Sequence, residues 1–124
     1  MPLPHSIELH DSRLAEVRRE GAMLVLRLSP AYIHRDGKGW SQEAEVTIAG
    51  GASVSMPGNL PVGISDGTLN TAEGQYDNLL VLPLNDGGPS LFELVLVSGE
   101  TLRVEGQAVA VRLLGEPRFV EDVA

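Results

Sequence analysis

The chain has 124 residues, of which 43% are hydrophobic and 21% charged, and this predicts one globular domain over residues 1–124. Acidic side chains (17) outnumber basic ones (9), and the net charge of −8 disfavours binding to nucleic acid or to anionic membrane surfaces. Without cysteine, disulfides, cysteine-bound zinc, iron–sulfur clusters and thiol catalysis are excluded. No secretory signal and no membrane-spanning apolar run are recognisable, so we expect a cytoplasmic protein. We also expect that the protein needs no cofactor.

Apolar and polar residues alternate along most of the chain, which predicts β-strands rather than helices. Residues 12–19 and 23–29 are expected to pair as a hairpin across the turn Glu20-Gly21. A further strand follows, in which Ala44, Val46 and Ile48 alternate with polar residues on a wet face. The least regular stretch, residues 50–74, is predicted to be a long loop.

The second half of the chain continues the strand pattern. Residues 79–84 and 91–97 are almost continuously apolar, which is typical of strands covered on both faces, and Pro83 marks an edge, a strand end or a bulge. Asp86-Gly87-Gly88-Pro89 reads as a turn, and alternation returns in residues 102–105 and 108–113. We count about eight strands and predict an all-β fold, a single antiparallel sandwich or barrel.

Residues 32–40 form the most informative segment, because they contain the only tryptophan and the only lysine of the chain. Asp36-Gly37-Lys38-Gly39 is expected to be the tip of a hairpin. Tyrosine, tryptophan and arginine in a loop are the residue types that carry binding energy at interfaces. The alternative is a long hairpin whose Trp40 packs on the end of the barrel. The candidate binding residues are Tyr32, His34, Arg35, Asp36, Trp40 and, from a separate segment, His10.

Two short motifs imitate catalytic sites, and neither is expected to be one. Residues 63–67 match G-x-S-x-G, but a serine hydrolase needs a histidine later in the chain and none follows His34. We expect a hairpin turn at Ser65-Asp66-Gly67 instead. In His10-Asp11-Ser12, neighbours on a strand point to opposite faces, so no triad forms, and His10 and Ser12 share a face if this segment is a strand. A structural role for the aspartate or serine at the strand entry is predicted, and no catalytic residue is assigned.

A metal site is conceivable only if folding joins distant residues. His10, His34 and either Asp11 or Asp36 would then supply two imidazoles and a carboxylate. The acidic stretch of residues 66–78 lacks the spacing of a calcium loop. We therefore predict no metal ligand from local sequence.

One stretch resembles known proteins. Leu9-His10-Asp11-Ser12-Arg13-Leu14, then Val17, a glycine turn and Leu24-Val25-Leu26-Arg27-Leu28, resembles the opening of several small bacterial β-rich domains. Some of these are similar to immunity proteins that neutralise toxins. The resemblance covers residues 9–28 and implies a compact β domain without a catalytic motif.

Two functions remain open. The first is a non-catalytic β domain that acts by self-association, as a homodimer, or by binding a protein partner, since doubly apolar strands need cover. The second is a small-ligand-binding or metal-dependent barrel with its site near His10, His34 and Trp40, where a histidine would act as general base.

Overall fold

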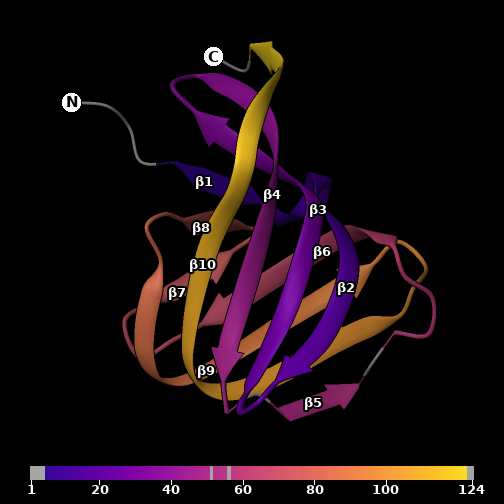
Figure 1. Cartoon of the computed structure of the whole chain (residues 1–124), viewed down its shortest axis with the longest axis vertical. Helices are drawn as coiled ribbons and strands as arrows, with labels where there is room; N and C mark the ends of the chain where they lie inside the picture. Colours follow the sequence, from indigo (N-terminus) through magenta and orange to yellow (C-terminus); the bar gives the residue numbers. More distant parts are fainter. Residues whose placement is uncertain (1–4, 51, 56, 123–124) are drawn as a thin grey trace.

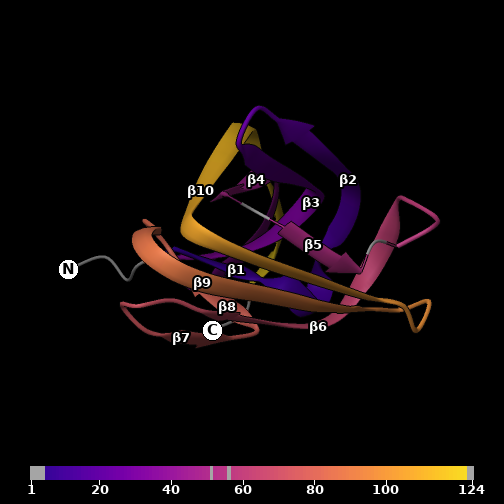
Figure 2. The same ribbon diagram turned by 90° about the horizontal axis from the view of Figure 1, so that it is seen from below.

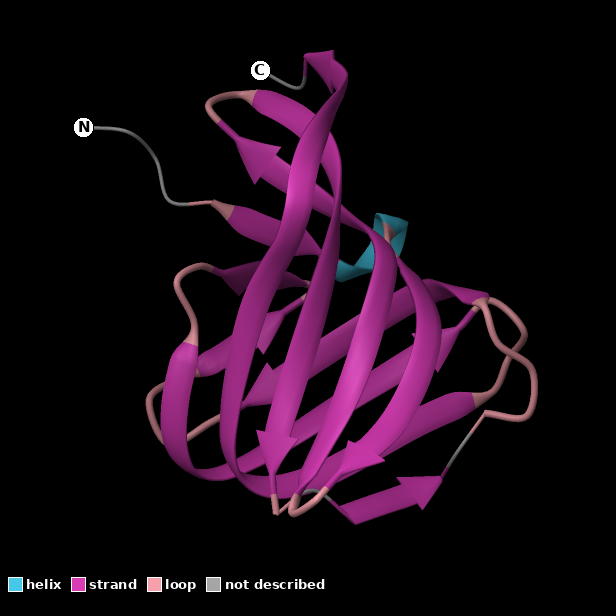
Figure 3. Cartoon of the chain, in the orientation of Figure 1, coloured by secondary structure: helices cyan, strands magenta, loops and turns pink. Residues whose placement is uncertain are grey.

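The computed structural model describes residues 5–50, 52–55 and 57–122, with residues 52–55 described for their backbone alone. These residues form ten β-strands joined by turns and one short 3₁₀ turn, η1 (Leu9–Asp11), drawn in cyan in Figure 3. The strands are β1 (Ser6–Glu8), β2 (Arg13–Glu20), β3 (Met23–Arg35), β4 (Lys38–Ala49), β5 (Ala52–Ser55), β6 (Val62–Asn70), β7 (Gln75–Asp77), β8 (Leu79–Val81), β9 (Asn85–Leu96) and β10 (Thr101–Asp122). The predicted all-β fold is confirmed. The count exceeds eight because the sequence pattern does not predict β1, β5, β6 and β7. Of these, β1 and β7 have three residues each, too few to show alternation.

Six of the strands close into a ring, so the sheet is a barrel. The antiparallel pairings run β2–β3–β4–β10–β9–β6 and return from β6 to β2. Figures 1 and 2 show β6 and β9 on one side of the ring and β2, β3 and β4 on the other. The seam is short, since β2 and β6 join only through Arg13 opposite Gly63 and Leu14 opposite Val62. Closure removes the free edges that an open sheet of these strands would expose.

Four short strands extend the sheet beyond the ring. β1 continues the sheet from β3 and carries β8 on its other edge, while β5 pairs with β10 and β7 with β6. Pro83 is expected at an edge, a strand end or a bulge, and it follows a strand end, because β8 ends two residues before it. The described residues include no helix of the length and apolar character that crossing a membrane requires. The cytoplasmic location stays a prediction.

Leucine, isoleucine and valine fill the interior, and Phe92 is its one fully buried aromatic side chain among the described residues. The η1 turn inserts Leu9 into this interior against Gly67 of β6. A Cβ on Gly67 would lie 2.7 Å from Leu9 Cδ1 and 2.8 Å from Leu94 Cδ2. A larger residue at position 67 would therefore force the Leu9 and Leu94 side chains to shift within the packed interior.

The predicted loop over residues 50–74 is wrong, and so is the turn at Ser65-Asp66-Gly67. Both fall on strands, since this stretch contains β5 and the nine-residue β6. The register between β6 and β9 shifts between Ile64 and Asp66, and this irregularity interrupts the two-residue alternation. The serine in the G-x-S-x-G motif thus lies within a strand, where the helix of a hydrolase elbow is missing.

Three expectations about the later strands also need correction. Asp86–Pro89 lies inside β9, where Gly88 has a φ of +89° and Gly87 pairs with Ala108. The two runs at 102–105 and 108–113 belong to one 22-residue strand, β10. The apolar runs are covered on one face alone, since Val95 is 43% and Val97 67% exposed, with Leu79 and Val81 also exposed. In an antiparallel barrel wall the outer face meets solvent.

The long strands β3, β4 and β10 continue past the ring and form an outgrowth, at the top of Figure 1. We use this name for residues 31–35 of β3, 38–42 of β4 and 118–122 of β10. Register shifts between Leu28 and Ala31 in β3, and between Leu114 and Arg118 in β10, separate the outgrowth from the ring. The predicted hairpin tip is confirmed, with Asp36 and Gly37 in the turn at φ values of +53° and +73°.

Candidate functional site

One cross-strand row of apolar side chains runs from the core out to the surface of the outgrowth. Residues directly opposite each other in antiparallel strands place their side chains on the same face. The register aligns Leu80, Ile7, Ile33, Trp40 and Phe119 on β8, β1, β3, β4 and β10. The first three are buried, Trp40 is half-buried and Phe119 is 54% exposed. The apolar interior therefore reaches solvent at an aromatic pair.

The aromatic pair has a defined geometry. The rings of Trp40 and Phe119 meet edge to face, with centroids 5.6 Å apart and planes at 77°. The guanidinium of Arg35 lies 5.8 Å from the centroid of the Trp40 ring, and Trp40 Nε1 donates to the Arg35 carbonyl at 3.4 Å. Trp40 thus packs on the barrel end, as one sequence reading expected, and also presents a surface shared with Phe119 and Arg35. We refer to Arg35, Trp40 and Phe119 as the aromatic surface.

Tyr32 and His34 lie on the opposite face of the outgrowth, because they alternate with Ile33 along β3. Their rings pack edge to face with centroids 5.2 Å apart, and His34 Nε2 contacts Glu8 Oε2 at 3.0 Å. The Tyr32 hydroxyl donates to Glu121 Oε1 at 2.7 Å. Burial, followed by the Glu121 hydrogen bond, raises the pKa of Tyr32 to about 12. This face is polar and internally hydrogen-bonded.

The remaining candidates take different positions. Asp36 is exposed in the hairpin turn, with its Oδ2 atom 3.7 Å from Arg35 Nε. His10 lies in η1, where its Nδ1 contacts the Ser65 carbonyl at 2.9 Å and its Nε2 lies 4.0 Å from Asp11. The bond to the Ser65 carbonyl and then the charge of Asp11 raise the pKa of His10. The structure therefore groups Arg35 with Trp40 and Tyr32 with His34, and gives His10 separate contacts.

The segment that holds His10 is a 3₁₀ turn and not a strand, so the condition under which His10 and Ser12 would share a face is not met. Three residues with 3₁₀ geometry precede β2 and carry His10 away from the strand. The structural role of Ser12 is confirmed. Its buried hydroxyl donates to the Glu8 carbonyl at 2.7 Å and accepts from the Tyr32 amide at 2.9 Å. Ser12 thereby fixes the turn against β3.

The candidate metal ligands lie in separate environments in the structure. Among the described residues, no group of three or more histidine, aspartate or glutamate side chains is placed to hold a metal ion. His10 contacts Ser65 and Asp11, whereas His34 contacts Glu8 and Tyr32. The structure thus gives no support to a two-histidine metal centre.

The barrel wall contains a buried carboxylate that the sequence pattern does not predict. Glu45 of β4, predicted to be on a wet face, has a side chain only 5% exposed. It accepts hydrogen bonds from Arg18 of β2 and Arg112 of β10, both at 2.9 Å, and from Arg27 of β3 at 3.5 Å. The bonds from Arg18 and then Arg112 outweigh burial and lower the pKa of Glu45. This cluster fastens four neighbouring strands and is assigned a structural role.

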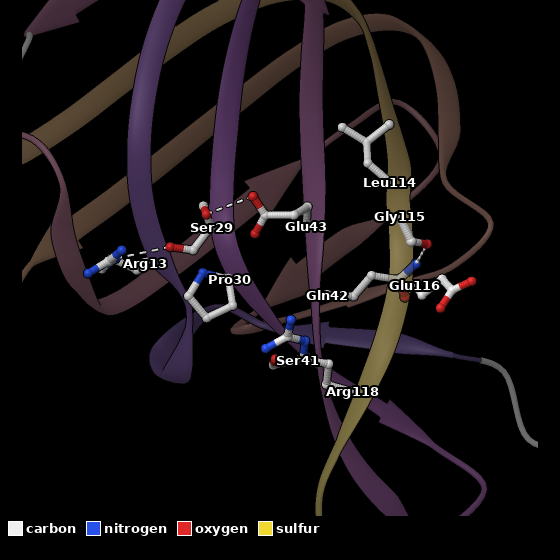
Figure 4. Close-up of a pocket in the computed structure, with 10 residues that line it drawn as sticks. All are labelled: Arg13, Ser29, Pro30, Ser41, Gln42, Glu43, Leu114, Gly115, Glu116 and Arg118. Carbon is white, nitrogen blue, oxygen red and sulfur yellow. Dashed lines mark hydrogen bonds between the residues drawn. The ribbon is translucent and has the colours of Figure 1, made fainter.

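The largest of three surface depressions described for the protein has a volume of about 380 Å³ and lies where the outgrowth meets the ring (Figure 4). A second, apolar depression of about 310 Å³ is bounded by His5, Leu82, Pro83, Val111 and Leu113. A third, of about 370 Å³, adjoins Glu45 and Arg112. His10, His34 and Trp40 line none of these three. The largest is lined by Arg13, Ser29, Pro30, Ser41, Gln42, Glu43, Leu114, Gly115, Glu116 and Arg118.

Comparison with known proteins finds no relative of this chain. No family model, no curated protein and no solved structure matches the chain. The resemblance of residues 9–28 to small bacterial β-rich domains therefore stays a prediction. Its strand–turn–strand form is present as the β2–β3 hairpin, an arrangement common to many folds.

Proposed function

We propose that the protein is a non-catalytic protein-binding module and that the aromatic surface is the centre of its binding site. The observation that carries this proposal is the cross-strand row, which leads from buried Ile33 to Phe119, 54% exposed. Exposed aromatic and arginine side chains on a rigid support are the groups that dominate the energy of protein interfaces. Trp40 supplies that support here, because it also packs against the hydrophobic core.

A second copy of the chain is the partner that the charges favour at this place. Over the whole chain the net charge is −8, which makes two copies repel each other. The outgrowth taken together with its hairpin turn at residues 36–37 is balanced, because three basic residues are matched by three acidic ones. These residues are Arg35, Lys38, Arg118, Asp36, Glu121 and Asp122. Repulsion between copies is therefore weakest where the aromatic surface lies.

The backbone beside the aromatic surface also has hydrogen-bonding groups that a partner strand could pair with. Within the described residues, the 118–122 segment of β10 pairs with β4 on one edge and has no strand on the other. An unpaired strand edge offers hydrogen-bonding groups to a further strand. Val120, which is 49% exposed, lies in the middle of this segment. We infer that the partner contacts both the ring of Phe119 and this edge.

Sedimentation equilibrium of the wild type, Phe119→Ser and Val97→Ser tests the proposal. Val97 is the matched control, since it is 67% exposed but lies beyond β9, away from the outgrowth. We expect the weight-average mass of the wild type and of Val97→Ser to rise with concentration, and that of Phe119→Ser to stay monomeric. A wild type that remains monomeric to about 1 mM would contradict self-association, because a dissociation constant in that range corresponds to only about 4 kcal/mol.

A further inference from the structure

The depression of about 380 Å³ where the outgrowth meets the ring is framed by two irregular strand segments that face each other across β4. In β3, the register shift between Leu28 and Ala31 displaces Ser29 and Pro30 from the ladder. In β10, the shift between Leu114 and Arg118 displaces residues 115–117. Bulges of this kind redirect side chains and are common beside binding sites. The depression thus exists because both neighbours of β4 leave their regular pairing at the same level.

Hydrogen bonds hold both walls of the depression in place. Arg13 Nε donates to the Ser29 carbonyl at 3.0 Å, which fixes the displaced part of β3 against β2. Gln42 Nε2 donates to the Gly115 carbonyl at 2.9 Å, which fixes the displaced part of β10 against β4. Figure 4 shows both bonds on either side of Pro30. A site whose walls are already bonded loses little conformational entropy when a ligand enters.

The two arginines of the depression differ from most others in the protein. Five arginines have a carboxylate partner, namely Arg18, Arg27, Arg35, Arg103 and Arg112. Within the described part of the chain, the Arg13 side chain bonds only the Ser29 carbonyl, and the Arg118 side chain has neither a hydrogen bond nor an ion pair. In an acidic protein, two guanidinium groups without carboxylates therefore line one depression.

The carboxylates at the depression leave these guanidinium groups free. Glu43 accepts from Arg27 at 3.2 Å and from the Ser29 hydroxyl at 2.7 Å, so its Oε1 is already engaged. In Figure 4 the Glu116 carboxylate points away from Pro30, whereas the Arg118 guanidinium lies beside Pro30 and Ser41. The donors without a carboxylate partner that line the depression are thus those of Arg13, Arg118 and Ser41.

We propose that this depression binds a carboxylate group, with the guanidinium groups of Arg13 and Arg118 as its hydrogen-bond donors. The planar fork of arginine matches a carboxylate with paired hydrogen bonds. Pro30 and Leu114 give apolar walls to the alkyl part of the ligand. A ligand with one charge is favoured over a phosphate, which carries nearly two, because Glu43, Glu116 and the net charge of −8 repel each added negative charge. The volume of about 380 Å³ accepts a small organic acid or the C-terminal residue of a polypeptide.

Nuclear magnetic resonance of the arginine Nε–Hε groups tests this site, with butyrate as the probe and butyramide as its uncharged equivalent. Butyrate is expected to produce saturable shifts at Arg13 and Arg118, and butyramide none. Arg118→Gln and Arg13→Gln should each weaken butyrate binding by about tenfold, since each removes charge-assisted hydrogen bonds. Arg103→Gln is the matched control on the same strand, β10, and should leave the affinity unchanged.

Additional ligands show where the carboxylate comes from, and several results would overturn the proposal. A short peptide with a free C-terminus that binds more tightly than butyrate, and loses binding when amidated, assigns the carboxylate to a polypeptide. Equal affinities assign it to a small acid. Equal shifts with butyramide, equal affinity of Arg118→Gln and Arg103→Gln, or tighter binding of inorganic phosphate would each contradict the proposal. The oligomeric state of Phe119→Ser is independent of these results, so the two proposals fail separately.

Discussion

Glu45→Gln replaces the buried carboxylate of the barrel wall with a neutral side chain of the same shape. The substitution removes the charge that faces Arg18 and Arg112 at 2.9 Å and Arg27 at 3.5 Å. Three guanidinium groups from β2, β3 and β10 then share one neutral amide oxygen in place of a carboxylate, and the new amide nitrogen is a donor that cannot pair with them. The expected result is a loss of stability with little change in shape, because the amide fills the same space.

The structure sets the size of this loss. Each of the two short bonds is charge-assisted and contributes about 1.5–3 kcal/mol. Part of this is regained by hydration, since Arg112 is 72% exposed and Arg18 about one third exposed. We expect a net loss of about 2–3 kcal/mol, which lowers the melting temperature by about 8–12 °C for a chain of this length. Glu43→Gln is the matched control and should cost less than about 1 kcal/mol, because the Glu43 side chain is 39% exposed.

Urea unfolding followed by far-ultraviolet circular dichroism measures both variants, and pH gives a second readout. The pKa of Glu45 is lowered in the folded state from its ordinary value of 4.5. Its contribution is therefore complete above that value and is lost as the pH falls through the lower folded pKa. The difference between wild type and Glu45→Gln should shrink in acid. Equal losses for Glu45→Gln and Glu43→Gln at neutral pH, or a difference unchanged in acid, would refute the reasoning.

Three further predictions concern the core, the outgrowth and the η1 turn. Gly67→Ala should cost about 1–3 kcal/mol in urea unfolding, because the added Cβ would lie 2.7 Å from Leu9 Cδ1 inside the interior. Trp40→Ala should abolish the concentration-dependent mass while leaving a folded β spectrum; a chain that no longer folds would favour a packing role alone. Asp11→Asn should lower the pKa of His10 measured by nuclear magnetic resonance, since the charge of Asp11 helps to raise it, and an unchanged value would refute that assignment.

The sequence predicts strands best where alternation is unbroken. The β2–β3 hairpin and the turn at residues 36–37 follow from uninterrupted alternation and from turn residues at its breaks. β6 and the first half of β9 were missed because glycines and register shifts interrupt the pattern there. The closing pair of Arg13 and Gly63 joins residues 50 positions apart, and no local pattern encodes it. Closure of the ring therefore emerges only in the folded chain.

Only part of the candidate site is predictable from the sequence, because its residues come together through strand pairing. Trp40 and Arg35 were found because aromatic residues are scarce in this chain. Phe119 was missed, since Gly115 and Pro117 precede it and read as the end of a strand. Tyr32 was grouped with Trp40 by proximity in sequence, although cross-strand register places it on the other face. Pairing partners, rather than neighbours in sequence, define this surface.

The central claim, that the aromatic surface binds protein, is tested most directly by amide spectra recorded over a dilution series. Chemical shifts that move with concentration should be confined to residues 35–40 and 118–122, and should not move in Phe119→Ser. Spectra that are independent of concentration, or shifts gathered around the exposed Val95 and Val97 instead, would contradict the claim.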